Sequence, residues 1–594
     1  MAQLVEHHLA KVRVAGSNPV VRSERVSYLP WRGRFFTGGV AERRGNGLQI
    51  RVHGFKSRLH LGRLAQLVAR FPDTEEVISS SLVPPTKQKA PAAAGAFTLS
   101  AMGTEVGQQH FSREQRQQYR HKVLACLDVL EEMLHAGAFT EEAHRTGLEI
   151  ELNLVDADHQ PSFANAEVLE AIANPEFQTE LARFNIEFNV PPGDIAGTHL
   201  LDLEASLRAS LNEAERRSTE SGNHIVMTGI LPTVMPEHFQ GDWMSGNTRF
   251  AALNDAMLAA RGEDIHLDIE GPTGERLDAF ADSLAPESAC TSVQFHLLVA
   301  PREFARAWNA AQVLAGPQLA LGANSPFVFG HRLDAESRIA VFTQAADTRP
   351  VEYANQGVRP RVFFGERWIT SIFDLFEENS RWFPALLPEI SDEDPRAVFA
   401  AGGTPELAEL KLHNGTIYRW NRPVYDVVGN KAHVRLENRV LPAGPTIADT
   451  LANAAFYYGA LNRMARDDRP VWTRMAFRSA HDNFDAAAHQ GIDADLFWPG
   501  LGETPASELV LRHILPVAQA GLEEWGVDGA AIDRYLGIIE GRCLSGVNGA
   551  DWQVRCVEAL EARGMSRRDA LTAMTVAYAE RMHTNDPVHT WDLP

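Results

Sequence analysis

The sequence predicts an α+β fold in which an antiparallel sheet packs on helices. Four segments alternate apolar and polar residues with period two, which is typical of strands with one buried face. Segments with helical periodicity lie between and after them, as in α+β domains. The 594 residues are 44% hydrophobic and 22% charged, a composition typical of a folded globular protein.

The first of these strands is predicted over residues 146–155, which read TGLEIELNLV. Glu149 and Glu151 share the polar face of this strand, roughly 7 Å apart. Two bare carboxylates at that distance repel by about 2 kcal/mol at an effective dielectric near 20. A divalent cation between them would remove this cost. For this strand alone, the solvent-exposed face of an edge strand is an equal alternative.

The other three strands carry similar polar rows. They are predicted over residues 184–190, 293–297 and 433–440, with polar faces made of Asn185, Glu187, Asn189, Gln294, His296, His433, Arg435, Glu437 and Arg439. Surface strands usually carry Thr, Lys and Ser at such positions. An antiparallel sheet whose apolar face packs on helices gathers these rows on one surface. The pattern therefore predicts a site for metals or phosphates on that surface.

The chain before the third strand is predicted as follows. Ser112 and Gln115 form a capping box that opens a helix through residue 134. Helices follow at 165–173, 175–184 and 200–220, and the run Pro191-Pro192-Gly193 is expected to end the second strand. A short strand is expected at 224–229. The polar loop 242–249 offers Asn247 and Arg249 as substrate or nucleotide ligands, although a loop arginine is more often solvated.

The second half of the chain reads mainly as helix. A helical region at 304–322 is expected to break at Gly316-Pro317, and Arg338 follows as a possible bidentate partner for a substrate carboxylate or as part of a surface salt bridge. Residues 378–410 read as an irregular acidic insertion, and 413–422 as a loop. An apolar helix at 447–461 would pack beneath the sheet. Further helices are predicted at 508–522, 530–540, 552–562 and 567–582.

The net charge of the first hundred residues is opposite in sign to that of the rest of the chain. Residues 1–101 hold 15 Lys+Arg against 6 Asp+Glu, a net charge of +9, whereas the whole chain carries −21. This segment repeats Ala-Gln-Leu-Val at residues 2 and 65, and it resembles a translation of tandem transfer-RNA genes. We predict a disordered, mis-annotated extension at 1–101, with a transit peptide or a basic nucleic-acid arm as alternatives. The catalytic domain is then expected at 102–465, with a helical region at 466–594.

Several classes of protein are disfavoured. The net charge argues against a nucleic-acid surface for the chain as a whole, and no apolar run reaches the length of a membrane span. The four cysteines form no CxxC pair, which fits a reducing cytoplasm. The chain carries no P-loop, no GxSxG elbow, no HExxH pair and no GxGxxG fingerprint.

The ordered segments GLEIELNLV, IEFNVPPGD, VQFHL, ANSPF and RLENRVLPAGPT resemble the glutamate–cysteine ligase family over roughly residues 145–462. That resemblance implies the funnel-shaped antiparallel sheet of the glutamine synthetase and guanido kinase catalytic domains. It implies ATP-dependent joining of the glutamate γ-carboxylate to the amine of cysteine through an acyl phosphate, the first step of glutathione-type thiol synthesis. Another acceptor amine, guanidino phosphotransfer and a non-catalytic glutamate or nucleotide sensor remain alternatives. The oligomeric state stays open.

The resemblance also implies roles for individual residues, with ATP and Mg²⁺ as cofactors. Arg439 would contact phosphate and Arg338 the substrate carboxylate. Gln294 would lie on the nucleotide side of the funnel. The implied magnesium ligands are Glu149, Glu151, Glu187, His296 and Glu437. The residues agree with this chemistry, because phosphoryl transfer depends mainly on neutralising charge.

Overall fold

The structure is a computed structural model that describes residues 39–44, 47–52 and 106–594. Contacts divide the chain into two units, residues 1–92 and 93–594. Within the first unit the structure describes a two-stranded antiparallel hairpin, β1 (Gly39–Arg44) and β2 (Gly47–Val52), which the sequence pattern did not predict. The rest of the predicted disordered segment lies outside the described residues, so that expectation stays a prediction.

A seven-stranded sheet forms the centre of the second unit and confirms the predicted α+β class. Its strand order is β14-β15-β9-β3-β5-β4, with β6 paired to the far end of β3, and every pairing is antiparallel. The strands are β3 (Arg145–Val155), β4 (Phe177–Thr179), β5 (Asn185–Asp194), β6 (His224–Val226), β9 (Val293–Leu298), β14 (Asn421–Val428) and β15 (Lys431–Asn438). The four strands predicted from alternation are therefore all present and adjacent.

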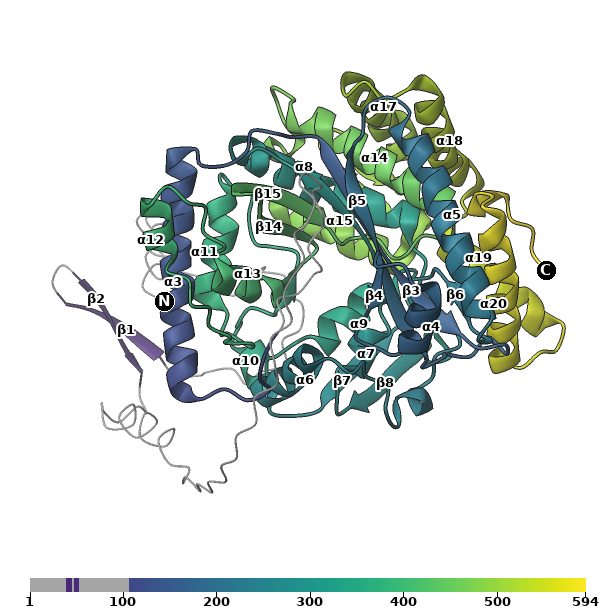
Figure 1. Ribbon diagram of the computed structural model, residues 1–594, viewed down its shortest axis with the longest axis horizontal. Helices are drawn as coiled ribbons and strands as arrows, with labels where there is room; N and C mark the ends of the chain where they lie inside the picture. Colours follow the sequence, from purple (N-terminus) through teal and green to yellow (C-terminus); the bar gives the residue numbers. More distant parts are fainter. Residues whose placement is uncertain (1–38, 45–46, 53–105) are drawn as a thin grey trace. The chain divides into compact units, whose positions relative to one another are not determined.

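Helices cover the apolar face of this sheet. Residues of α8 (Pro301–Gly322) and α14 (Ile447–Ala465) are buried almost throughout, and the Tyr458 hydroxyl donates to the carbonyl of His296 in β9 at 3.0 Å. Figure 1 shows α5 (His199–Thr219) with the C-terminal helices along one side of the sheet. Those helices are α17 (Leu515–Glu524), α18 (Gly529–Ser545), α19 (Gly549–Ala562) and α20 (Arg567–Thr584).

The second unit contains further helices and short strands. The helices are α3 (Arg113–Ala136), α4 (Asn165–Ile172), α6 (Thr248–Arg261), α7 (Ala285–Ser288), α9 (Ser337–Ala345), α10 (Val351–Asn355), α11 (Ile372–Trp382), α12 (Pro395–Ala400), α13 (Ala408–Gly415), α15 (Phe477–Gln490) and α16 (Ala506–Leu509). Short strands β7 (Ile265–Glu270), β8 (Arg276–Ala281), β10 (Phe327–Val328), β11 (His331–Arg332), β12 (Val362–Phe363), β13 (Tyr418–Arg419), β16 (Asp495–Trp498) and β17 (Gly502–Pro505) pair in twos. Among the described residues no helix is long and apolar enough to cross a membrane.

Two expectations about strands were wrong. Residues 175–184 were predicted as a helix, but β4 pairs there with β5, and its short alternation of Phe177, Gln178 and Thr179 follows the sheet. The pair Pro191-Pro192 does not end β5, which continues to Asp194 opposite Arg145, beyond a register shift in β3.

The segment predicted as a loop over 413–422 contains the start of β14. This strand lies at the edge of the sheet, where Pro423 faces Leu436 without needing a hydrogen-bond donor. The acidic segment 378–410 contains the end of α11, all of α12 and the start of α13, so it is more regular than predicted.

The predicted break at Gly316-Pro317 was also wrong. Helix α8 runs through Pro317, and both residues are buried. A Cβ atom at Gly316 would lie 2.8 Å from the Cβ of Asn483 in α15. Close packing of two helices therefore explains this glycine better than a chain break does.

Candidate active site

The register of the central strands brings the predicted polar residues together. Glu149 in β3 lies opposite Gln294 in β9, and Glu437 in β15 lies opposite His296 in β9. On the other side of β3, Glu151 faces Glu187 in β5. Directly opposed residues in an antiparallel sheet point to the same face. The polar rows of four strands therefore form one continuous surface.

The first cluster on this surface consists of Glu149, His296 and Glu437, whose ligand atoms all lie within 4.8 Å of one another. Glu149 and Glu437 are fully buried and His296 is 2% exposed. Among the residues that the structure describes, neither carboxylate oxygen of Glu149 has a hydrogen-bond partner, and His296 Nε2 has none although it lies 3.1 Å from Glu149 Oε1. Buried polar atoms without partners are costly, so this cluster fits a cation.

Two arginines hold this cluster in place. Arg422 binds Glu437 through both oxygens, with Nη2 at 2.9 Å from Oε1. Although burial alone raises the pKa of Glu437, Arg422 and Arg439 lower it to about 2, so the carboxylate is ionised. Arg435 Nε donates to His296 Nδ1 at 3.3 Å. Binding a cation at Nε2 requires the ring proton at Nδ1, and this contact with Arg435 then has to open.

The second cluster consists of Glu151, Glu180 and Glu187, again with ligand atoms within 4.8 Å. Burial, followed by the charge of Glu180, raises the pKa of Glu151 to about 7. Burial, and then the neighbouring carboxylates Glu149 and Glu180, raise the pKa of Glu187 well above its usual range. A divalent cation relieves both burial and repulsion, and carboxylate oxygens are the ligands that Mg²⁺ prefers. The all-oxygen donor set of this second cluster thus fits magnesium.

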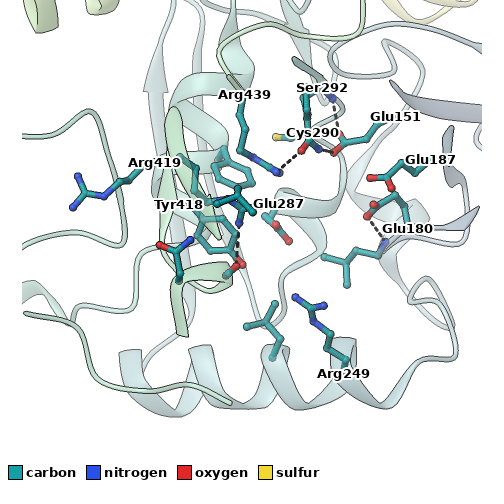
Figure 2. Close-up of a pocket in the computed structure, with 18 of the residues that line it drawn as sticks. Glu151, Glu180, Glu187, Arg249, Glu287, Cys290, Ser292, Tyr418, Arg419 and Arg439 are labelled. Carbon is teal, nitrogen blue, oxygen red and sulfur yellow. Dashed lines mark hydrogen bonds between the residues drawn. The ribbon is translucent and has the colours of Figure 1, made fainter. Parts of the chain in front are cut away.

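Glu151, Glu187 and Gln294 of this surface line one cavity of about 560 Å³ together with Glu180. The buried residues Glu149, His296 and Glu437 are not among those that line it. Figure 2 shows Glu151, Glu180 and Glu187 on one wall, with Arg439 and Tyr418 across from them. Arg439 Nη1 donates to Gln294 Oε1 at 2.6 Å and lies 3.5 Å from Glu437 Oε1. A cavity of this size accommodates a nucleotide or a comparable small-molecule pair.

The structure places the predicted arginines as follows. Arg338 lines the cavity and is 3% exposed; its Nε donates to Glu336 at 2.8 Å and its Nη2 to the Val440 carbonyl at 2.5 Å. Arg249 also lines the cavity, from the first turn of α6. Burial lowers the pKa of Arg249, and the charge of Arg422 lowers it further. These side chains supply positive charge opposite the acidic clusters.

Asn247 is not among the residues that line the cavity. Its side chain caps α6 by accepting from the backbone N–H of Arg249 at 2.8 Å. The structure therefore gives it a local role that the sequence did not predict, in which it holds the helix that carries Arg249.

Several residues that line the cavity were not predicted from the sequence. Glu180 went unnoticed because β4 was taken for a helix; the period-two pair of Gln178 and Glu180 was the available signal. Arg422 lies on the missed strand β14 and also lines the cavity. Glu287, on the four-residue helix α7, carried no periodic signal at all.

A buried carboxylate surface with arginines around one cavity has the chemistry that sites for metal ions and phosphate groups require. Comparison of the sequence with family models assigns the chain to a particular family. The model described as "Glutamate-cysteine ligase family 2 (GCS2)" matches residues 145–569. The chain therefore belongs to glutamate–cysteine ligase family 2. No curated protein matches the chain.

Solved structures resemble it at low sequence identity. A Francisella tularensis glutamate–cysteine ligase in complex with AMP is 11% identical, with a TM-score of 0.47, covering 77% of this chain and 91% of that chain. A bifunctional glutathione synthetase from Pasteurella multocida is 13% identical, with a TM-score of 0.43. The match covers 77% of this chain and 55% of the synthetase chain.

Proposed function

We propose that this protein is an ATP- and Mg²⁺-dependent γ-glutamyl ligase that joins the γ-carboxylate of glutamate to the amine of cysteine. The observation that supports it most is a cavity lined by Glu151, Glu180 and Glu187 together with several arginines, with the buried cluster of Glu149, His296 and Glu437 on the same face of the sheet. Family membership supports a ligase of this type.

The proposed reaction begins with activation of a carboxylate. A carboxylate is a poor electrophile, so ATP phosphorylates the glutamate γ-carboxylate and the amine then displaces phosphate from the acyl phosphate. Magnesium ions would be held by Glu149, His296 and Glu437, and by Glu151, Glu180 and Glu187. They would supply the charge neutralisation that phosphoryl transfer needs.

The arginines have distinct proposed tasks. Arg439 bridges Gln294 and Glu437 at the junction of the clusters, which suits contact with the transferred phosphate. Arg338 is held by Glu336 and by the Val440 carbonyl, which suits fixed binding of a substrate carboxylate. Gln294 and Arg249 line the same cavity and would bind the nucleotide or the substrate.

The test is phosphate release by the full-length chain supplied with ATP, Mg²⁺, glutamate and a panel of amines. Release that requires both glutamate and cysteine, with γ-glutamylcysteine found by mass spectrometry, is the expected result. Release with glutamate and another amine would keep the mechanism and change the acceptor. Nucleotide or glutamate binding without turnover on any amine would favour a sensor and contradict the proposal.

Two arginine variants test the proposed role of Arg338 in the same assay. Arg338→Lys should raise the KM for glutamate at least tenfold, since lysine cannot reproduce a fixed guanidinium fork. Arg302→Lys, at an exposed position in the first turn of α8, is the matched control and should behave as wild type. An unchanged KM in Arg338→Lys would remove Arg338 from the substrate site.

A further inference from the structure

Glu287 is a carboxyl group of the cavity that belongs to neither carboxylate cluster. It lies on α7, between β8 and β9, and Figure 2 shows its carboxylate pointing into the cavity between Tyr418 and Glu180. Two hydrogen bonds stabilise the turn that carries Glu287. The backbone N–H of Cys290 donates to the Glu287 carbonyl at 3.0 Å, and the Ser288 hydroxyl donates to the Ala285 carbonyl at 2.8 Å.

The Glu287 carboxyl can still accept a hydrogen bond. Its Oε2 is buried and has no hydrogen-bond partner within the described part of the chain. The nearby arginines are engaged elsewhere, because Arg439 binds Gln294 and Arg338 binds Glu336. No ion pair joins Glu287 to any residue that the structure describes. A half-buried carboxyl that has one buried oxygen and no protein cation beside it in a substrate cavity is suited to a cation that arrives with the substrate.

The charges around Glu287 favour proton uptake. Burial, and then the charges of Glu180 and Glu151, raise its pKa to about 8 against the opposing charge of Arg439. Tyr418 and Cys290 also face it, and burial raises the pKa of both. A general base works best when its pKa lies near the working pH. At neutral pH this carboxyl therefore exchanges protons readily.

We propose that Glu287 is a catalytic residue that pairs with the ammonium group of the acceptor amine and removes one proton from its nitrogen. This inference rests on the proposed ligase function and extends it to the second substrate. The chemical class of ligand at this position is a primary ammonium.

The step balances as follows. The ammonium gives one proton to the Glu287 carboxylate and becomes a neutral amine with a lone pair. That lone pair forms the C–N bond to the carbonyl carbon of the acyl phosphate, and the bond from that carbon to the phosphate oxygen breaks. The departing phosphate takes the second proton from nitrogen, and Glu287 releases its own proton to solvent. No oxidant or further reactant is needed.

The test compares two nucleophiles in the Glu287→Gln holoenzyme. Cysteine arrives as an ammonium and needs a base, whereas hydroxylamine is mostly uncharged at neutral pH and does not. We expect turnover with cysteine to fall about 10²-fold or more and turnover with hydroxylamine to stay within about threefold of wild type. The deficit with cysteine should shrink as the pH is raised, because the free amine then forms in solution.

Two further variants make the result decisive. Glu303→Gln, an exposed position in the first turn of α8, is the matched control and should behave as wild type with both nucleophiles. Glu287→Asp keeps a carboxylate and should recover part of the rate with cysteine. Equal losses with both nucleophiles, no loss, or no recovery in Glu287→Asp would overturn the assignment. Absence of turnover in the wild type with every amine would instead overturn the ligase function itself.

Discussion

At the scale of single residues, the central observation is Glu149. A strand pattern that alternates so regularly commonly has a solvated polar face, yet this carboxylate is fully buried and neither oxygen finds a hydrogen bond. Burying a charge without a partner is costly. This arrangement is the one that we expect for a ligand of the proposed cation.

If Glu149 binds the proposed cation, Glu149→Ala should lose nearly all turnover while the protein stays folded. The reason is that the alanine removes a ligand of the proposed cation together with an unpaired buried charge. Steady-state turnover and thermal unfolding, each with and without Mg²⁺, provide the measurement. Mg²⁺ should raise the Tm of the wild type by linkage and raise that of the variant less.

Glu270→Ala, at an exposed position of β7, is the control for Glu149→Ala and should keep its activity. Full activity in Glu149→Ala, or an equal Mg²⁺ response in both proteins, would show that Glu149 does not bind the metal.

A second residue-scale prediction concerns His413 in α13. This histidine is buried, and its Nε2 lies 2.9 Å from the Asn379 carbonyl, which places the ring proton there. Burial, together with Arg361, lowers the pKa of His413 to about 4. Since the unfolded chain binds the proton more tightly, the contribution of His413 to stability is present above about pH 6.5 and is lost as the pH falls toward 4.

The measurement is the free energy of unfolding of wild type and His413→Gln at pH 7 and pH 5. The wild type should lose about 2 kcal/mol more than the variant over this interval. The same pH dependence in both proteins would contradict the assignment of a neutral, buried His413.

At the scale of elements, pairing between strands decides the site. Glu180 joins Glu151 and Glu187 only because the three-residue strand β4 adds to β5. Arg422 reaches Glu437 only because β14 pairs with β15 in the register that sets these two residues opposite each other. Neither β4 nor β14 has a strong pattern of its own, so their pairing partners determine their conformation.

Helix packing beneath the sheet gives a prediction at the same scale. A Cβ atom at Gly521 in α17 would lie 1.9 Å from the Gly459 carbonyl oxygen of α14. Gly521→Ala must therefore push the two backbones apart and should destabilise the protein by about 3 kcal/mol or more. Chemical denaturation measures this loss.

Gly537 in α18 is the matched control, because a Cβ atom there meets nothing within 4 Å. Gly537→Ala should stabilise the protein by about 0.5–1 kcal/mol through helix propensity. Similar effects of the two substitutions would show that α14 and α17 do not pack this closely.

At the scale of the whole molecule, residues 93–594 form one compact unit that contains the sheet, the cavity and the C-terminal helices. Helix α18 is tied to α14 by Arg542, which binds Asp449 at 2.8 Å and Asn453 at 2.7 Å in the buried interior. These contacts support a packing role for the helical region. The predicted boundary near residue 465 stays a prediction.

The extent of this unit and of the family match predicts that residues 1–101 are dispensable. A chain beginning at Met102 should show the kcat and Tm of the full-length protein, because the cavity residues all lie between Glu151 and Arg439. Parallel assays of both chains test this. A shortened chain that unfolds or loses activity would assign the N-terminal segment a structural or catalytic part.

Local alternation along the chain was enough to predict the face of the sheet that carries the candidate site. Alternation in four segments identified the polar rows that carry Glu149, Glu187, His296 and Glu437, because a period of two is a local property of the chain. The tertiary structure alone decided which side chains from other elements reach those rows. Glu180 directly follows a short edge strand, Arg422 lies on a proline-containing edge strand, and Glu287 lies on a single helical turn. Contacts distant in sequence set the conformation of such segments, and no local pattern records those contacts.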